Sequence, residues 1–248
     1  MKEAVVVFGK TAEPGNVKTR LSPPLSPEEA ATLYTAFAKD TMEMVCRFQK
    51  EREESPAARG EVAMILAWDG EESDPLVEFA RERGFLIRDQ GAGDLGSRLR
   101  RVVAGLREEG ADRLVVVGTD SPTLSPEHLH MAYHYLGSQD VVFGPSFDGG
   151  YYLVGLGEIR EEVAAAEEVI FEAISWSSVR VLEQSWQRAR QDGLLCELLS
   201  FWYDVDTFED LKILRFHLKE YLAKRDPLLG QYTRQTLETS SLREIEET

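Results

Sequence analysis

The chain has 248 residues, of which 43% are hydrophobic and 29% are charged, a composition typical of a globular protein and not of a disordered one. Its 28 basic and 44 acidic residues give a formal net charge of −16, which argues against a basic face for binding a nucleic-acid backbone. The apolar runs fall short of the ~20 residues of a membrane helix, and the run at 4–8 is too short for a signal peptide. We therefore expect a cytoplasmic protein without nucleic-acid or membrane partners.

Apolar runs typical of buried strands alternate along the chain with segments of helical periodicity. In chain order, the pattern predicts a strand at 4–8, a helix at 27–46, a strand at 62–68, a helix at 75–83, a strand at 85–88, a helix at 95–106, a strand at 114–117, a helix at 126–136, strands at 141–143 and 151–156, a helix at 178–191, a strand at 196–199 and a helix at 208–224. This alternation predicts an α/β fold, a single three-layer α/β/α domain with a mostly parallel sheet, over residues 1–225.

Two segments depart from the alternation. Residues 49–61 are charged and lack apolar periodicity, so we expect a solvated loop. Residues 226–248 are polar after Leu229 and are predicted to form a loose or partner-packed tail. Packing of this tail on a second copy would give a homodimer. Cys46 and Cys196 have no CxxC partner, which argues against a zinc cluster.

The loop after the first strand has the composition of a phosphate-binding loop. Ligands of open α/β sheets bind beyond the carboxyl ends of the strands. This loop contains two glycines and three cations, namely Gly9, Gly15, Lys10, Lys18 and Arg20. Glycines let backbone N–H groups approach an anion, and Lys and Arg form charge-assisted hydrogen bonds with phosphate. The loop matches neither the P-loop nor the Rossmann pattern, and an exposed turn with solvated charges is the alternative.

Carboxylates follow the fourth strand and precede the last long helix. Asp120 ends a buried strand, where a charge is costly unless it is paired or bound to a metal, and it is placed to hold Mg²⁺ or Mn²⁺ against a diphosphate. Asp204 and Asp206 share a face if their segment is extended. The alternatives are an Asx turn before Pro122 for Asp120 and helix capping for Asp206.

Two glycine-rich loops complete the pattern. The loop at 90–98 leads into a helix, whose free N–H groups favour an anion or a base edge. The loop at 147–152 combines two glycines with two tyrosines, which offer close backbone approach and stacking surface. A tight turn explains either loop alone, but all these loops in one chain point to a ligand site.

The ordered set of motifs resembles a known family. The motifs are Phe8-Gly9-Lys10, Pro14-Gly15, Lys18-Thr19-Arg20-Leu21, Gln90-Gly91, Asp94-Leu95-Gly96, Gly118-Thr119-Asp120-Ser121-Pro122, Gly144-Pro145, Asp148-Gly149-Gly150-Tyr151-Tyr152 and Tyr203-Asp204-Val205-Asp206-Thr207. Over about residues 3–215 they resemble the glycosyltransferase-like, radical-SAM/selenodomain-associated transferases. That family is similar to the GT-A nucleotide-diphospho-sugar transferase fold, which includes phospholactate and molybdenum-cofactor guanylyltransferases. The resemblance implies a GT-A fold and a transferase that uses a nucleotide donor and Mg²⁺ or Mn²⁺.

The resemblance also implies roles for individual residues. The nucleotide-binding residues would be Gly9, Lys10, Gly15, Lys18, Arg20, Gln90, Gly91, Leu95, Gly96 and Arg98. Asp120 and Asp206 would hold the metal, and Lys18 and Asp120 would be catalytic. The acceptor-binding residues would be Asp148, Gly149, Gly150 and Tyr151.

Three functions stay open at this point. The first is transfer of a glycosyl group from a nucleotide-sugar to a small acceptor. The second is transfer of a nucleotidyl group from an NTP, which has a triphosphate for the cationic loop to bind. The third is a non-catalytic nucleotide-binding module that serves a partner enzyme. Release of pyrophosphate or of a nucleoside diphosphate separates the first two functions, and turnover separates both from the third.

Overall fold

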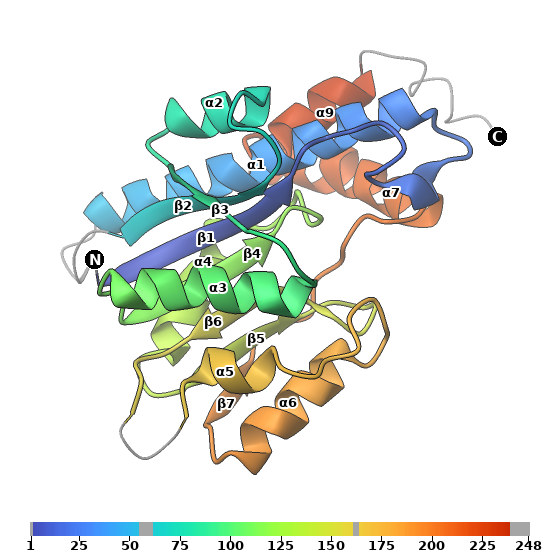
Figure 1. Cartoon of the computed structure of the whole chain (residues 1–248). Helices are drawn as coiled ribbons and strands as arrows, with labels where there is room; N and C mark the ends of the chain where they lie inside the picture. Colours follow the sequence, from blue (N-terminus) through green and yellow to red (C-terminus); the bar gives the residue numbers. More distant parts are fainter. Residues whose placement is uncertain (1, 55–61, 161–163, 239–248) are drawn as a thin grey trace.

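The computed structural model describes residues 2–54, 62–160 and 164–238 and has a seven-stranded sheet at its centre (Figure 1). The strands are β1 (Glu3–Lys10), β2 (Val62–Asp69), β3 (Leu86–Asp89), β4 (Arg113–Gly118), β5 (Val141–Pro145), β6 (Tyr151–Leu156) and β7 (Cys196–Leu198). Their order is β3-β2-β1-β4-β6-β5-β7, and β6 alone runs antiparallel to its neighbours β4 and β5. The predicted α/β fold with a mostly parallel sheet is confirmed.

Helices cover both faces of the sheet (Figure 1). One face packs against α1 (Pro27–Glu54), α2 (Pro75–Arg81) and α4 (Pro126–Tyr135). The other face packs against α3 (Leu95–Glu108), α5 (Ala166–Ile170) and α6 (Val181–Gln191). Outside α1, a third apolar cluster joins it to α7 (Phe208–Phe216), η2 (His217–Leu222) and α9 (Gln231–Glu238). The prediction did not include α5.

The first strand shows why continuous apolar runs form this sheet. Successive side chains of a strand point to opposite faces, so both faces of a strand between two helix layers must be apolar. Val5 and Val7 pack into the α1 layer, whereas Ala4 and Val6 pack into the α3 layer, and all four are fully buried. The run at 4–8 is therefore a central strand.

The helix predicted at 27–46 continues to Glu54, so the predicted loop is wrong for residues 49–54. Tertiary contacts explain the extension. Phe48 stacks on Tyr133 with 5.6 Å between ring centroids, and Arg52 pairs with the buried carboxylate of Glu3 at 2.6 Å. The charged side chains of this last part of α1 obscure its apolar periodicity. The remainder of the predicted loop, 55–61, lies outside the described residues.

The segment after residue 226 is not loose as far as residue 238, which corrects the prediction for that part of the tail. Residues 231–238 form α9, which packs along α1 and buries Leu237. The buried carboxylate of Asp40 on α1 accepts hydrogen bonds from the backbone N–H groups of Tyr232 and Thr233, both at 2.9 Å, and from Thr233 Oγ1 at 2.6 Å. A carboxylate at a helix N-terminus satisfies N–H groups that lack partners within the helix. The last ten residues of the predicted tail, 239–248, lie outside the described residues.

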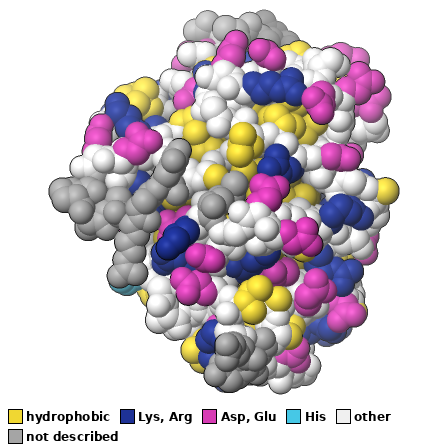
Figure 2. All heavy atoms as spheres, turned by 60° about the vertical axis from the view of Figure 1, so that its left-hand side comes forward, with side chains coloured by type: hydrophobic (Ala, Val, Ile, Leu, Met, Phe, Trp, Pro, Cys, Tyr) yellow, Lys and Arg dark blue, Asp and Glu magenta, His cyan; other side chains and the backbone are white. Residues whose placement is uncertain are grey.

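The long helix predicted at 208–224 is confirmed, but its middle part is a π-helix. It runs through α7, η2 and the short α8 (Ala223–Arg225) without a break. Among the described residues, no helix has the length and hydropathy needed to cross a membrane. Figure 2 shows basic side chains interspersed with acidic ones over one face of the molecule, so a phosphate backbone would meet both signs of charge there.

The sheet brings several loops to one edge. Lys10 at the end of β1 lies in register with Asp69 at the end of β2, and Phe8 lies in register with Gly118 at the end of β4. Because β6 is antiparallel, its first residue, Tyr151, lies at this same edge. The loops after β1 and β4 therefore face the β5–β6 turn.

The contact between Asp40 and α9 predicts a pH dependence of stability. Burial raises the pKa of Asp40 to about 6, from an ordinary value of 3.8. A folded-state pKa above the unfolded value contributes stability that is fully present below about pH 3.8 and is lost as the pH rises through about 6. The free energy of unfolding should therefore increase by about 1 kcal/mol between pH 7 and pH 5 relative to Asp40→Asn. Urea unfolding of both proteins at the two pH values measures this difference, and equal pH slopes would contradict it.

Candidate active site

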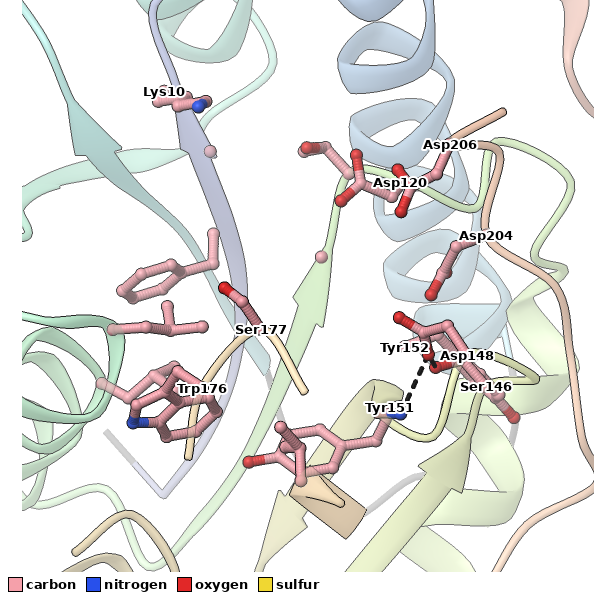
Figure 3. Close-up of a pocket in the computed structure, with 18 of the residues that line it drawn as sticks. Lys10, Asp120, Ser146, Asp148, Tyr151, Tyr152, Trp176, Ser177, Asp204 and Asp206 are labelled. Carbon is pink, nitrogen blue, oxygen red and sulfur yellow. Dashed lines mark hydrogen bonds between the residues drawn. The ribbon is translucent and has the colours of Figure 1, made fainter. Parts of the chain in front are cut away.

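A cavity of about 1080 Å³ opens at the edge of the sheet where these loops meet. Its walls come from the loop after β1, the start of α3, the end of β4, the β5–β6 turn, the α5–α6 loop and the segment at 204–206. Figure 3 shows Asp120, Asp206, Asp204 and Asp148 along one side of this cavity, and Trp176 and Ser177 across from them. The size exceeds that of most small-molecule sites and leaves room for two ligands side by side.

The four aspartates on this side, Asp120, Asp148, Asp204 and Asp206, form an acidic wall, and Lys18 pairs with two of them at one end. Its ammonium pairs with Asp120, and with Asp206 at 2.9 Å, and only 4% of its side chain is exposed. The backbone of Lys18 has φ 47°, the left-handed conformation, immediately before the 3₁₀ turn η1 (Thr19–Leu21). The flanking apolar residues Val17 and Leu21 are buried, which fixes the loop on α1 and directs the Lys18 side chain inward.

Charge pairing maintains the ionised forms of this cluster. Burial alone would lower the pKa of Lys18, but the carboxylates of Asp120 and Asp206 outweigh it and raise this pKa. Burial alone would raise the pKa of Asp206, but Lys18 and Arg20 outweigh it and lower this pKa. Lys18 and Asp206 therefore each favour the charged form of the other.

Two other cations of the loop after β1 line the cavity. The guanidinium of Arg20 contacts Asp206 at 2.5 Å, yet 66% of its side chain remains exposed. Lys10 Nζ donates to the carbonyl of Asn16 at 3.0 Å, and the Lys10 backbone N–H donates to the hydroxyl of Tyr34 at 3.0 Å. Gly9 also lines the cavity, whereas Gly15 lies outside its lining. Nucleotide binding by these residues stays a prediction.

The Gln90 side chain connects two strand ends. Its Nε2 donates to the carbonyl oxygens of Gly9, at 2.7 Å, and Ala67, at 3.0 Å, so both amide protons are used within the protein. Its predicted role in nucleotide binding is thus limited to its oxygen, which accepts from Arg98 at 3.4 Å. Arg98 also pairs with Asp69. Both Arg98 and Gln90 line the cavity.

The other residues predicted from this loop divide into two groups. Leu95 lines the cavity, whereas Gly91 and Gly96 do not. A Cβ atom at Gly96 would lie 2.7 Å from the indole nitrogen of Trp176, so this glycine lets the α5–α6 loop approach the start of α3. Sequence reasoning did not find this contact, because nothing in the chain pairs a tryptophan with a glycine 80 positions earlier.

The β5–β6 turn brings Asp148 to the far end of the acidic wall. Asp148 accepts from the hydroxyl of Ser146 and from the backbone N–H of Gly150, at 2.9 Å. Gly149, with φ 90°, lies outside the lining and packs on the backbone of Val179. Tyr151 lines the cavity, but its ring packs on the core residue Phe143, with 5.4 Å between ring centroids. Acceptor binding here stays a prediction.

Asp204 is a further carboxylate of this wall. The resemblance assigned it no role, although its spacing from Asp206 placed both on one face. Ser121 donates a hydrogen bond to Asp204, and burial, together with the nearby charges of Asp120 and Asp148, raises its pKa to about 6. Four aspartates thus line one side of the cavity, namely Asp120, Asp148, Asp204 and Asp206, in addition to Asp69, which pairs with Arg98.

The donor set fits a divalent cation. The four aspartates provide hard oxygen ligands, and their charge exceeds that of Lys18 and Arg20 beside them. Among the described residues, no group of three or more His, Cys, Asp or Glu side chains is arranged to chelate a metal by itself. Mg²⁺ commonly uses one or two carboxylates together with substrate phosphates. The arrangement therefore suits a cation that arrives with a phosphate ligand.

The chain is similar to nucleotide-using transferases over most of its length. A 2-phospho-L-lactate guanylyltransferase from Methanothermobacter thermautotrophicus is 26% identical over 218 residues, which are 84% of this chain and 85% of that protein. A crystal structure from Desulfovibrio desulfuricans G20, described as a candidate nucleotide-diphospho-sugar transferase, is 28% identical with a TM-score of 0.73, and the match covers 95% of this chain and 99% of that one. A 4-diphosphocytidyl-2C-methyl-D-erythritol synthase from Anaerococcus prevotii has a TM-score of 0.53 at 10% identity over 88% of this chain and 96% of that one, which shows the fold alone.

Fold, cavity and relatives together define a nucleotide-dependent transferase of the nucleotide-diphospho-sugar transferase fold, and the resemblance drawn from the motifs is confirmed. The chain belongs to the family described as "Uncharacterized protein conserved in bacteria (DUF2064)", which matches residues 54–178. The matched segment contains Asp120 and Asp148 but not the cationic loop after β1.

Replacement of Lys18 tests the ion cluster. In Lys18→Met, Asp120 and Asp206 lose their shared cation and repel each other. We therefore expect the free energy of unfolding to fall by about 2 kcal/mol. This loss is smaller than for a fully buried pair because Asp120 is half exposed. Millimolar Mg²⁺ should restore more stability to this variant than to the unaltered protein. Thermal unfolding with and without MgCl₂ measures both effects. The control is the double variant Lys18→Met with Asp206→Asn. It removes the repulsion and should therefore lose less free energy of unfolding than Lys18→Met alone. Unchanged stability in the single variant would contradict the charge balance.

Proposed function

We propose that this protein transfers a nucleotidyl group from an NTP to a small acceptor and releases pyrophosphate, with the help of a divalent cation. The observation that carries the proposal is that Lys18 joins the cationic loop after β1 to the aspartates of the acidic wall within one cavity. Similarity to a guanylyltransferase over more than four fifths of both chains supports nucleotidyl transfer.

The loop after β1 would bind the triphosphate. Arg20 is largely exposed at the cavity and presents a planar set of hydrogen-bond donors. Lys10 is the last residue of β1, the strand that leads into this loop. The ammonium of Lys18 has three donors and uses two of them on Asp120 and Asp206. Its third N–H would bind a phosphate oxygen, so Lys18 would position the carboxylates and contact the donor at once.

Asp120 and Asp206 would hold the cation. About half of the Asp120 side chain is exposed to the cavity, and Asp206 lies on the other side of the same ammonium. A bound Mg²⁺ or Mn²⁺ supplies charge neutralisation on the phosphate oxygens. Asp204 and Asp148 lie beyond them along the wall and would face the acceptor.

The transfer itself requires positioning and charge stabilisation. An oxygen of the acceptor bonds to the α-phosphorus of the NTP while the bond from this phosphorus to the bridging oxygen of pyrophosphate breaks. The electron pair of that bond leaves with pyrophosphate, and Arg20 and Lys18 would stabilise the negative charge that develops there.

Glycosyl transfer is the second candidate, because the structure from Desulfovibrio desulfuricans G20 is described as a nucleotide-diphospho-sugar transferase candidate and shares the fold at a TM-score of 0.73. In that reaction the bond between the anomeric carbon and the diphosphate oxygen breaks, and a nucleoside diphosphate leaves. Chromatographic analysis of the released nucleotide with each donor separates the two reactions. Pyrophosphate formation from an NTP supports the proposal, and nucleoside diphosphate formation from a nucleotide-sugar supports the second candidate.

Nucleotide binding is tested by thermal shift with NTPs, nucleoside diphosphates and nucleotide-sugars, each with and without Mg²⁺ or Mn²⁺. A ligand at ~100 times its dissociation constant stabilises by about 2.7 kcal/mol, which raises the Tm by roughly 2–4 °C at this size. We expect the largest metal-dependent shift with one NTP. No shift with any nucleotide would contradict the proposal.

Asp120→Asn tests the metal assignment. The amide keeps the shape of the side chain but removes the charge that binds the cation, so the metal-dependent part of the nucleotide shift should disappear while the fold remains. The matched control is Arg88→Ala, which removes a surface ion pair with Glu109 away from the cavity and should retain the shift. Metal-dependent affinity at the unaltered level in Asp120→Asn would exclude Asp120 as a ligand.

A further inference from the structure

The two ends of the cavity differ in charge. Among the described residues, the cations that line it come from the end of β1, the loop that follows and α3, and they are Lys10, Lys18, Arg20 and Arg98. They outnumber the three aspartates that pair with members of this set, Asp69, Asp120 and Asp206. The opposite end is built from the β5–β6 turn, the α5–α6 loop and Asp204. None of the described residues that line this second end is a Lys, Arg or His. If the donor phosphates occupy the cationic end, the acceptor occupies the acidic one.

The carboxylates of the acidic end are oriented by neutral donors. Ser146 and the Gly150 backbone N–H hold Asp148, and Ser121 holds Asp204. These contacts fix the direction of the carboxylates without neutralising their charge. A phosphate or carboxylate placed here would meet two negative groups and no cation among the described residues that line this end, whereas a group that donates hydrogen bonds would meet two oriented acceptors.

An apolar rim lies beside the acidic end. Phe147, which directly precedes Asp148, stacks on Phe201 with 5.5 Å between ring centroids. Their exposed fractions are 75% and 52%, and both lie outside the lining of the cavity itself. Val179, on the α5–α6 loop, lines the cavity with 78% of its surface exposed, and its backbone packs on Gly149 of the β5–β6 turn. Large apolar side chains left in solvent beside a polar site are typical of a ligand-contacting surface.

We propose that the acceptor is an alcohol without phosphate or carboxylate groups, whose hydroxyl or ammonium groups donate hydrogen bonds to Asp148 and Asp204 and whose apolar part rests on Phe147, Phe201 and Val179. This inference rests on the proposed function and names the acceptor class of that same site. It distinguishes the chain from its guanylyltransferase relative, which is named for an acceptor with both a phosphate and a carboxylate. As the hydroxyl oxygen bonds to the α-phosphorus, the O–H bond breaks and the proton passes to Asp148 and then to water.

A matched set of three-carbon probes tests the acceptor charge. With the preferred nucleotide and metal at saturation, the release of pyrophosphate or nucleoside diphosphate is followed with glycerol, serinol, 3-phenoxy-1,2-propanediol, glycerate, glycerol 3-phosphate and 2-phospho-L-lactate. We expect kcat/KM for the neutral and amine-bearing alcohols to exceed that for the three anions at least 100-fold, with the lowest KM for the phenoxy compound. Faster turnover with any of the anions would overturn the inference.

A second experiment tests the charge of the natural acceptor without identifying this compound beforehand. A deproteinised cell extract is separated on an anion-exchange column, and both fractions are added to protein, donor and metal. We expect the unretained fraction to support donor turnover and to yield a product of higher mass. Turnover that requires the retained fraction would overturn the inference. If the nucleotide binds but neither fraction supports turnover, both the proposed transfer reaction and this inference are wrong. If no nucleotide binds, the proposed function is already contradicted at the step of donor binding.

Substitution of Asp148 separates acceptor recognition from donor binding. Asp148→Asn should raise the KM for the active alcohol at least tenfold, because a hydrogen bond to a charged group is lost, and should lower kcat, because the proton acceptor is lost. Nucleotide affinity should stay unchanged. The same change should strengthen binding of glycerol 3-phosphate. Asp192→Asn, at the exposed end of α6, is the matched control and should change neither. Phe147→Ala should raise KM for the phenoxy probe alone. An unchanged alcohol KM in Asp148→Asn would contradict the role given to the acidic end.

Discussion

The ion cluster of Lys18, Asp120 and Asp206 is the interaction on which the site depends. It joins the loop after β1, the end of β4 and the segment before α7, which are far apart in the sequence. A backbone hydrogen bond from Val205 to Asp120, at 2.9 Å, supports the same junction. Because burial disfavours the charges of Lys18 and Asp206, each of these two groups depends on an ionised partner. Charge pairing therefore adds to the apolar packing of Val17 and Leu21 in holding this wall of the cavity.

The parts of the fold that the sequence predicted are those with local signals. The central strands are continuous apolar runs because helices cover both faces, and such runs are visible without knowledge of the partners. The end of α1 and the packing of α9 depend on distant contacts instead. Arg52 pairs with Glu3, and Asp40 binds α9 across 192 positions, so polar segments become ordered through partners that no local pattern identifies.

The candidate site was predictable in its positions but not in its pairings. Strand ends indicated the loops that hold Lys18, Asp120 and Asp148, because an α/β sheet gathers such loops at one edge. The resemblance assigned Lys18 to phosphate, whereas its ammonium is shared by two carboxylates, one of them 188 positions away. Likewise, the Gln90 amide joins β1 to β2. Residue type and spacing do not reveal which partner a buried polar group finds.

The proposed separation of donor and acceptor follows from the different segments that build the two ends of the cavity. Because β5 runs parallel to β4, the turn after it reaches this edge and places Asp148 beside Asp204, and because β6 is antiparallel, its first residues also begin there. The cationic end belongs to the loops of β1 and α3, and the acidic end belongs to this turn and to the α5–α6 loop. Since the two ends are built from different segments, the proposed function implies that a change in the turn would alter the acceptor while the nucleotide end kept its contacts. On this proposal, relatives with this fold can share a nucleotide donor and differ in the charge of the acceptor that they modify.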